Sequence, residues 1–86
     1  MGIKEPLNDL VLSIYPNPAN LTLNILDKQN LLNNANVSII NYLGQTVLSM
    51  PYSHQIDISN LLNGVYTVKI KTEQGKLYHS KFIKTE

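Results

Sequence analysis

Short stretches in which apolar and polar residues alternate recur along the chain about every ten residues, with turn-forming residues between them. Alternation with a period of two places every second side chain on one face of an extended strand. No stretch shows the period of an amphipathic helix. The predicted strands are Leu10–Ile14, Leu21–Leu26, Val37–Tyr42, Gln45–Met50, His54–Ile58, Val65–Lys71 and Leu77–Lys84. They predict an all-β fold, a seven-stranded antiparallel β-sandwich of immunoglobulin-like shape.

The alternation also predicts which side chains enter the core. The predicted inward side chains are Leu21, Leu23, Ile25, Ile56, Ile58, Tyr66, Val68 and Ile70. Asp57, Lys69 and Lys71 lie between them in sequence and are expected to face solvent.

The last strand alternates less cleanly, so two inward sets are possible. One is Leu77, His79 and Ile83, and the other is Tyr78, Ser80 and Phe82. We favour the set that buries the two aromatic rings, Tyr78 and Phe82.

Turn chemistry marks the connections. Gly44 predicts a tight hairpin, because such turns need a positive φ, and Gly75 predicts a bulge in the loop Thr72–Lys76. Pro51 is expected to end its strand. The segment Ser59–Gly64 is expected to form one capped turn, and the Asn33-Asn34 pair suits another.

The segment Tyr15-Pro16-Asn17-Pro18-Ala19 has the most restricted backbone in the chain. Each proline fixes its own φ, lacks a backbone donor and pushes the residue before it toward an extended conformation. No helix or central strand can pass through it. The segment is therefore a specific connector between the first two predicted strands.

Composition narrows the class of protein. The chain has 86 residues, 43% of them hydrophobic and 15% charged, with a net charge of +1. This length supports one small domain, here taken as residues 10–86 after a linker at 1–9. The weak charge excludes a nucleic-acid partner, and the absence of cysteine excludes disulfides and thiolate metal sites. The sequence contains no apolar run long enough to span a membrane, and residues 1–4 are not followed by the apolar region of a signal peptide. An export signal is therefore expected elsewhere in a longer protein.

Catalytic patterns are missing. The two histidines, His54 and His79, have no paired carboxylates at suitable spacing, and no Gly-x-Ser-x-Gly sequence is present. We therefore expect a protein that is not an enzyme and needs no metal or cofactor.

Four motifs in order resemble a known family. They are Tyr15-Pro16-Asn17-Pro18-Ala19, Asn41-Tyr42-Leu43-Gly44-Gln45, the stretch from Ile56 to Tyr66, and Lys81-Phe82-Ile83-Lys84. Together they resemble the type A C-terminal sorting domain of the type IX (Por) secretion system of Bacteroidetes-type bacteria. The resemblance runs from about residue 10 to residue 84. It departs from the family pattern only at the tail, where Thr85-Glu86 follow the last lysine, and in having no arginine.

The resemblance implies a removable address on a larger cargo protein. Such domains are recognised in the periplasm and carried through the outer-membrane translocon. A sortase-like peptidase then cuts the linker ahead of the sandwich, here about residues 3–9, and the cargo is anchored at the cell surface or released. The positions that match the family's recognition pattern are Tyr15, Pro16, Asn17, Pro18, Gly44, Gln45, Gly64, Tyr66, Lys81 and Lys84.

Each motif also has a structural interpretation. The proline motif suits a bend between sheets as well as a receptor contact. Tyr66 suits the tyrosine corner of sandwich folds, in which the hydroxyl bonds to upstream backbone. Lys81 and Lys84 suit the protection of an edge strand, or docking by strand addition on unpaired backbone groups, and exposed edges would permit a strand-paired dimer. An adhesive or carbohydrate-binding accessory sandwich is the alternative function.

Overall fold

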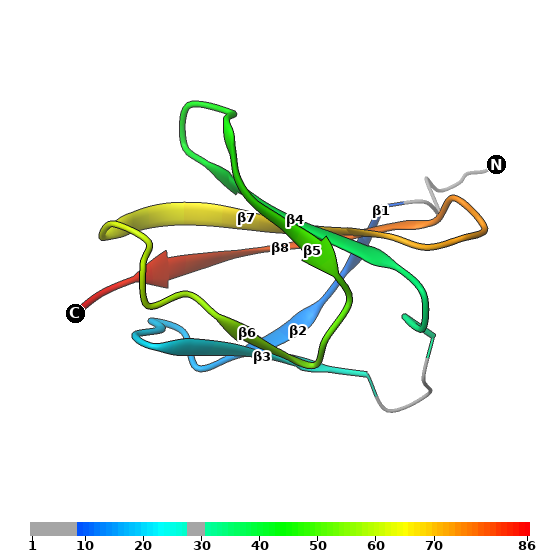
Figure 1. Cartoon of the computed structure of the whole chain (residues 1–86), viewed down its shortest axis with the longest axis horizontal. Coiled ribbons are helices and arrows are strands. Elements are labelled where there is room, and N and C mark those ends of the chain that lie inside the picture. Colours follow the sequence, from blue (N-terminus) through cyan, green and yellow to red (C-terminus); the bar gives the residue numbers. More distant parts are fainter. Residues whose placement is uncertain (1–8, 28–30) are drawn as a thin grey trace, which may run out of the picture.

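The chain forms two β-sheets that face each other (Figure 1). The structure is a computed structural model that describes residues 9–27 and 31–86, so the predicted linker lies outside the described residues except for Asp9. The strands are β1 (Asp9–Val11), β2 (Ser13–Tyr15), β3 (Thr22–Leu26), β4 (Asn36–Asn41), β5 (Thr46–Pro51), β6 (Gln55–Asp57), β7 (Gly64–Lys71) and β8 (Leu77–Lys84). One sheet has the order β1-β8-β7-β4-β5 and the other β2-β3-β6. The predicted all-β sandwich is confirmed.

No helix occurs in the part of the chain that the structure describes, and so none there is long and apolar enough to cross a membrane.

The core lies between the two sheets and is built from the alternating positions of the strands. It consists of Leu12, Ala19, Leu23, Ile25, Leu32, Ala35, Val37, Ile39, Ile56, Ile58, Tyr66, Val68, Ile70 and Phe82. Tyr78 packs against this core from β8, so the favoured inward set of the last strand is confirmed. The predicted outward positions Asp57, Lys69 and Lys71 are exposed.

The predicted first strand, 10–14, is divided in two. β1 pairs in parallel with β8, and β2 pairs antiparallel with β3 in the other sheet. Leu12 lies at the crossing, where its side chain is buried and its amide donates to the carbonyl of His79 at 3.0 Å. The sandwich therefore has eight strands where seven were predicted, and one pairing is parallel. An apolar run has no periodicity that could mark such a crossing.

Leu21 is also placed differently from the prediction. Its side chain is 62% exposed, whereas Leu23 and Ile25 are buried. Strand β3 begins only at Thr22, so Leu21 still belongs to the bend after the proline motif. Its carbonyl accepts a hydrogen bond from the amide of Ile58 at 3.0 Å, which fixes the backbone while the side chain points outward.

Two hairpins use the same three-residue loop. In the first, the amide of Gly44 donates to the carbonyl of Asn41, and the amide of Asn41 donates to the carbonyl of Gln45. The loop 72–76 repeats both bonds around Gly75. The φ angles are 85° at Gly44 and 88° at Gly75, so both predicted glycine roles are confirmed.

Side-chain acceptors shape two further turns. Asp27 accepts bonds from the amides of Leu31 and Leu32, at 2.9 and 3.2 Å, and so fixes the turn before β4. The same Asp27 carboxylate lies near the Tyr52 hydroxyl. The pKa of Tyr52 is raised, mainly because the hydroxyl is partly buried and also because of the negative charge of Asp27. After β6, the Asp57 carboxylate accepts from the amide and the hydroxyl of Ser59, and these bonds lower the pKa of Asp57. Asp57, the last residue of β6, is therefore the side-chain acceptor at the start of the turn predicted at 59–64.

Tyr66 forms the predicted tyrosine corner. Its hydroxyl donates to the carbonyl of Leu62, four residues upstream, and its ring is buried. The ring stacks on that of Phe82 with 5.5 Å between centroids, which joins β7 to β8 inside the core.

Replacing Tyr66 by Phe keeps the ring and removes this hydrogen bond. We expect a loss of about 1 kcal/mol in the free energy of unfolding, which lowers Tm by roughly 4–8 °C in a domain of this size. Urea and thermal unfolding followed by circular dichroism measure both quantities. Tyr42→Phe is the matched control, because Tyr42 is 81% exposed. Equal effects of the two substitutions would contradict a stabilising role for the corner.

Candidate recognition surface

The proline motif lies along the outer edge of the last strand. The Asn17 side chain bridges to β8, because its Oδ1 accepts from the amide of Ile83 at 3.0 Å and its Nδ2 donates to the carbonyl of Lys81 at 3.4 Å. These are the bonds that a neighbouring strand would make through its backbone. Asn17 can make them although both flanking residues, Pro16 and Pro18, lack amide hydrogens.

Backbone bonds continue this seam toward the C-terminal end. The amide of Ala19 donates to the carbonyl of Ile83, and the amide of Thr85 donates to the carbonyl of Ala19, both at 2.8 Å. Ala19 is fully buried, so this connector belongs to the core as well as to the sheet edge. We call the contacts between 16–19 and 81–85 the terminal seam.

The terminal seam overturns the prediction that β8 is an edge strand with unpaired backbone. β7 pairs with β8 along one side over its whole length. On the other side, β1 covers 77–79 and the terminal seam covers 81–85. Strand addition at β8 would require displacing these residues. The outermost strands of the two sheets are β1, β5, β2 and β6, and strand pairing through one of them remains a prediction.

The two lysines of the last motif lie in different environments. Lys81 is exposed on the outer face of the five-stranded sheet. Lys84 is only 4% exposed and lies inward, opposite Gly64, with its Nζ donating to the carbonyl of Thr85 at 3.1 Å. Lys84 was expected to be a solvent-facing edge residue, and this is wrong. Its methylene chain fills the end of the core while the ammonium reaches a carbonyl at the margin.

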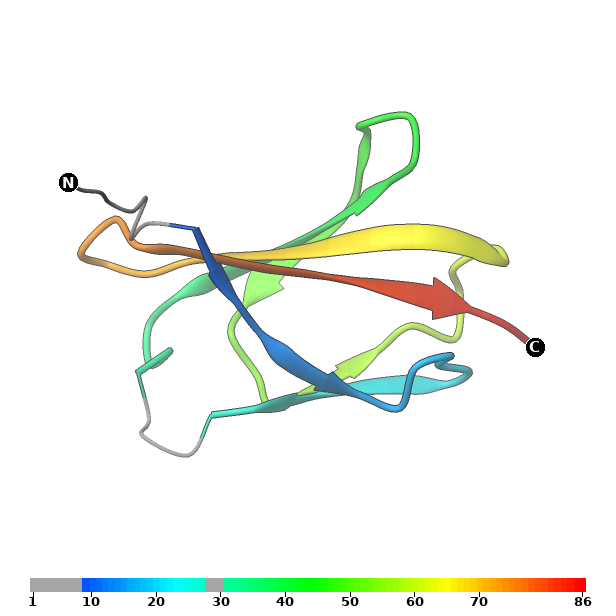
Figure 2. The same cartoon turned by 180° about the vertical axis from the view of Figure 1, so that it is seen from behind.

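The remaining motif residues are distributed around the same end of the sandwich. Tyr15 ends β2, with its ring half exposed and its carbonyl accepting from Asn24 Nδ2 at 3.2 Å. Gln45 follows the first hairpin, and its Oε1 accepts from Asn41 Nδ2 at 2.9 Å. Gly64 begins β7. Figures 1 and 2 show the start of β7, the turn before β3 and the C-terminus together at one end of the molecule, with the N-terminus at the other.

Three residues that are not among the ten predicted recognition positions also hold this end together. Ala19 and Thr85 complete the terminal seam. The Asn41 carboxamide oxygen accepts from the amides of Leu43 and Gln45, at 2.9 and 3.0 Å, and so fixes the hairpin. Asn41 has a sequence signal, since an Asn three residues before a turn glycine is a known turn former, whereas Ala19 and Thr85 have none.

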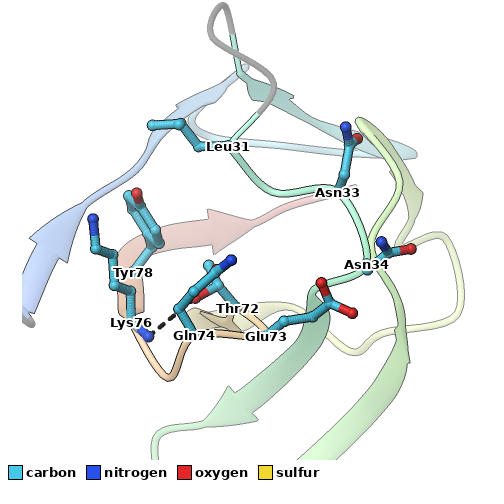
Figure 3. Close-up of a pocket in the computed structure, with 8 residues that line it drawn as sticks. All are labelled: Leu31, Asn33, Asn34, Thr72, Glu73, Gln74, Lys76 and Tyr78. Carbon is cyan, nitrogen blue, oxygen red and sulfur yellow. Dashed lines mark hydrogen bonds between the residues drawn. The ribbon is translucent and has the colours of Figure 1, made fainter.

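A polar hollow of about 390 Å³ lies at the opposite end of the sandwich, beside the loop that precedes β8. In Figure 3, Lys76 and Tyr78 line one side of it and Asn33, Asn34 and Glu73 the other. Amide, carboxylate and ammonium groups of this kind can hydrogen-bond a polar ligand. Among the described residues, no three His, Asp or Glu side chains are grouped closely enough to hold a metal ion.

Comparison with known proteins identifies the class to which this fold and these motifs belong. The model of the secretion system C-terminal sorting domain matches residues 13–85. The chain belongs to this family, which confirms the resemblance to type IX sorting domains.

One solved structure resembles the sandwich closely. It is PorZ of Porphyromonas gingivalis, described as an essential bacterial surface component of the type IX secretion system. The TM-score is 0.67 and the sequence identity 17%, over 87% of this chain and 11% of PorZ. The chain thus spans about a tenth of PorZ, and the likeness concerns the fold. No curated protein matches at a significant level.

The terminal seam predicts a local effect of Asn17→Ala. The substitution removes both side-chain bonds to β8, for a loss of about 1–3 kcal/mol in unfolding free energy. We also expect the amide of Ile83 to exchange with solvent at least about tenfold faster, because its acceptor is gone. Hydrogen exchange followed by NMR measures this directly. Asn20→Ala, an exposed position in the same connector, is the control, and an unchanged Ile83 amide would argue against the seam.

Lys84 and Lys81 should respond differently to truncation. Lys84→Ala removes about three buried methylene groups, so we expect a loss of about 2 kcal/mol in unfolding free energy. Lys84→Met keeps the apolar chain and should cost less than about 1 kcal/mol. Lys81→Ala should change stability by no more than about 0.5 kcal/mol, because its side chain is exposed. Denaturant unfolding of the three variants tests this order, and equal losses at positions 81 and 84 would refute it.

Proposed function

We propose that this domain directs a larger cargo protein across the outer membrane through the type IX translocon. It acts by being recognised as a folded surface and carries out no reaction itself. The observation that carries this proposal is the family match, which runs through nearly the whole sandwich and includes every motif position named above. Its partners are the translocon components and the cargo that precedes the domain.

The placement of the chain ends supports this role. The chain enters the sandwich at β1, whose first residue pairs with Leu77 beside the loop 72–76. The predicted recognition residues lie near the other end, around the terminal seam and the first hairpin (Figure 2). A cargo attached ahead of β1 would therefore extend away from the predicted recognition residues, which the translocon is proposed to bind.

The finer steps follow from the same proposal. The cargo and its sorting domain pass through the periplasm, and the translocon then moves them to the cell surface or the medium. A sortase-like peptidase cleaves ahead of β1. Cleavage ahead of Asp9 would leave intact all the sheet pairings that the structure describes, the first of which is Asp9 with Leu77.

An adhesive or carbohydrate-binding role is the second candidate, and the polar hollow in Figure 3 is the feature that favours it. Sugar sites usually add an aromatic side chain on which a sugar ring stacks. Tyr78 is half-buried at this hollow. A saccharide array probed with the labelled domain would test this candidate, and binding that Tyr78→Ala abolishes would support it.

Export of a reporter tests the sorting function. Residues 1–86 are fused behind a fluorescent protein that carries its own inner-membrane signal peptide, in a bacterium with the type IX route. We expect the reporter outside the cells, and we expect it to stay in the periplasm of a strain without the translocon. Retention in both strains would overturn the proposal, and so would equal release from both.

A further inference from the structure

Positive charge is concentrated on one face of the sandwich. Strands β4, β5, β7 and β8 contain no Asp or Glu. Their outward positions include the exposed Lys69, Lys71 and Lys81, which we call the lysine face. On the three-stranded sheet the only charged strand residue is Asp57, which is exposed. Apart from β1, which contains Asp9, the five-stranded sheet therefore presents only positive charges outward, whereas the one charged strand residue of the three-stranded sheet is negative.

A hollow of about 430 Å³ opens on the lysine face. The residues that line it are Ile40, Asn41, Tyr42, Gly44, Val65, Thr67, Lys69 and Lys81. The hairpin between β4 and β5 rises above β7 on this side and forms one wall (Figure 1). Asn41 holds that hairpin in shape through its three hydrogen bonds.

The sheet register arranges the floor and rim of this hollow. Thr67 pairs with Ile40 on one side and with Lys81 on the other, so these three side chains form one row. Lys69 lies two residues further along β7, on the same face. Val65, 48% exposed, lies two residues back. The floor thus has two apolar side chains, Ile40 and Val65, with Thr67 between them and the lysines, whose ammonium groups come from adjacent strands.

We propose that this hollow binds an extended acidic segment of a translocon protein. An apolar side chain of that segment rests on Ile40 and Val65, and its carboxylates meet Lys69 and Lys81, which both lie on the other side of Thr67. The inference rests on the proposed function and adds to it the place of contact and the chemistry of the partner. Charge complementarity of this kind steers association and rejects wrong partners.

A protein segment fits this surface better than a lipid or polysaccharide phosphate. Surfaces that bind anionic membranes usually present about four to eight Lys or Arg residues, and the lysine face has three. Bidentate hydrogen bonding to a phosphate group is typical of arginine, and the chain contains no arginine. The apolar side chains of Ile40 and Val65 next to the charges have no counterpart in a phosphate group, but they suit contact with a side chain of Leu or Val type.

Charge reversal in the reporter fusion tests the place of contact. We expect the double variant K69E and K81E to reduce export at least about tenfold, because like charges would then face each other in the complex. The variant K71E and K76E makes the same change in net charge outside the hollow and should export within about twofold of the parent. The variant K69R and K81R keeps the charge and should also export. Thermal unfolding of the purified domains must show all variants folded.

The outcomes separate this inference from the proposed function. If the parent fusion is exported and the K69E and K81E variant is exported equally well, the hollow is not the contact while the sorting function stands. If both double reversals fail to the same extent, overall charge matters and the specific site is refuted. If the parent fusion is retained, the sorting function itself fails.

A binding experiment tests the chemistry of the partner. The isotope-labelled domain is titrated with a synthetic peptide that alternates Asp and Leu, and with counterparts that alternate Ser and Leu or Lys and Leu. We expect amide shifts at Thr67, Lys69 and Lys81 with the acidic peptide alone, and weaker binding as salt is raised. Phosphatidylglycerol vesicles and inorganic phosphate are titrated in parallel. Binding to vesicles or phosphate without binding to the acidic peptide would overturn the inference.

Discussion

The contact on which the rest of this sandwich depends is the terminal seam, in which Asn17 and Ala19 pair with the end of β8. A segment with two prolines cannot supply a regular row of backbone donors, so the Asn17 carboxamide provides one donor and one acceptor in their place. The seam joins the proline connector to β8 on the side away from β7. Phe82, which stacks on Tyr66 of β7, lies within the seamed part of β8, so the connector is tied to the strand that makes the aromatic contact at this end of the core.

The seam also explains why such different motif residues gather at one end of the molecule. The Asn17 side chain hydrogen-bonds the outer edge of β8, and the buried Tyr66 hydrogen-bonds the carbonyl of Leu62 in the turn before β7. Lys84 is buried at the same end of the core. Each of them has a structural task. In the proposed role, these internal contacts would order the recognition surface before a partner binds, which lowers the entropy lost on binding.

Elements governed by local pattern could be predicted from the sequence. The alternation of β7 and the position of Gly44 give the observed faces and the observed hairpin, because both depend on neighbouring residues alone. The partners of β8 could not be predicted, since Asn17 and Ile83 are 66 residues apart and no window of sequence contains both. The burial of Lys84 was missed because residue type assigns lysine to solvent. Only part of the lysine face could be predicted. Alternation gives the outward direction of Lys69, but the hollow beside it depends on where the hairpin between β4 and β5 lies in the folded structure, which the local pattern does not determine.

The long sequence separation across the terminal seam has a consequence for the order of events during synthesis. Strand β8 supplies partners for β1, for Asn17 and for Ala19, so none of these contacts can form until β8 has left the ribosome. The chain loses the entropy of closing this long loop before the contacts that stabilise the closed loop have formed, and this makes folding slow. Any polypeptide joined ahead of β1 therefore emerges, and has time to fold, before the sandwich closes.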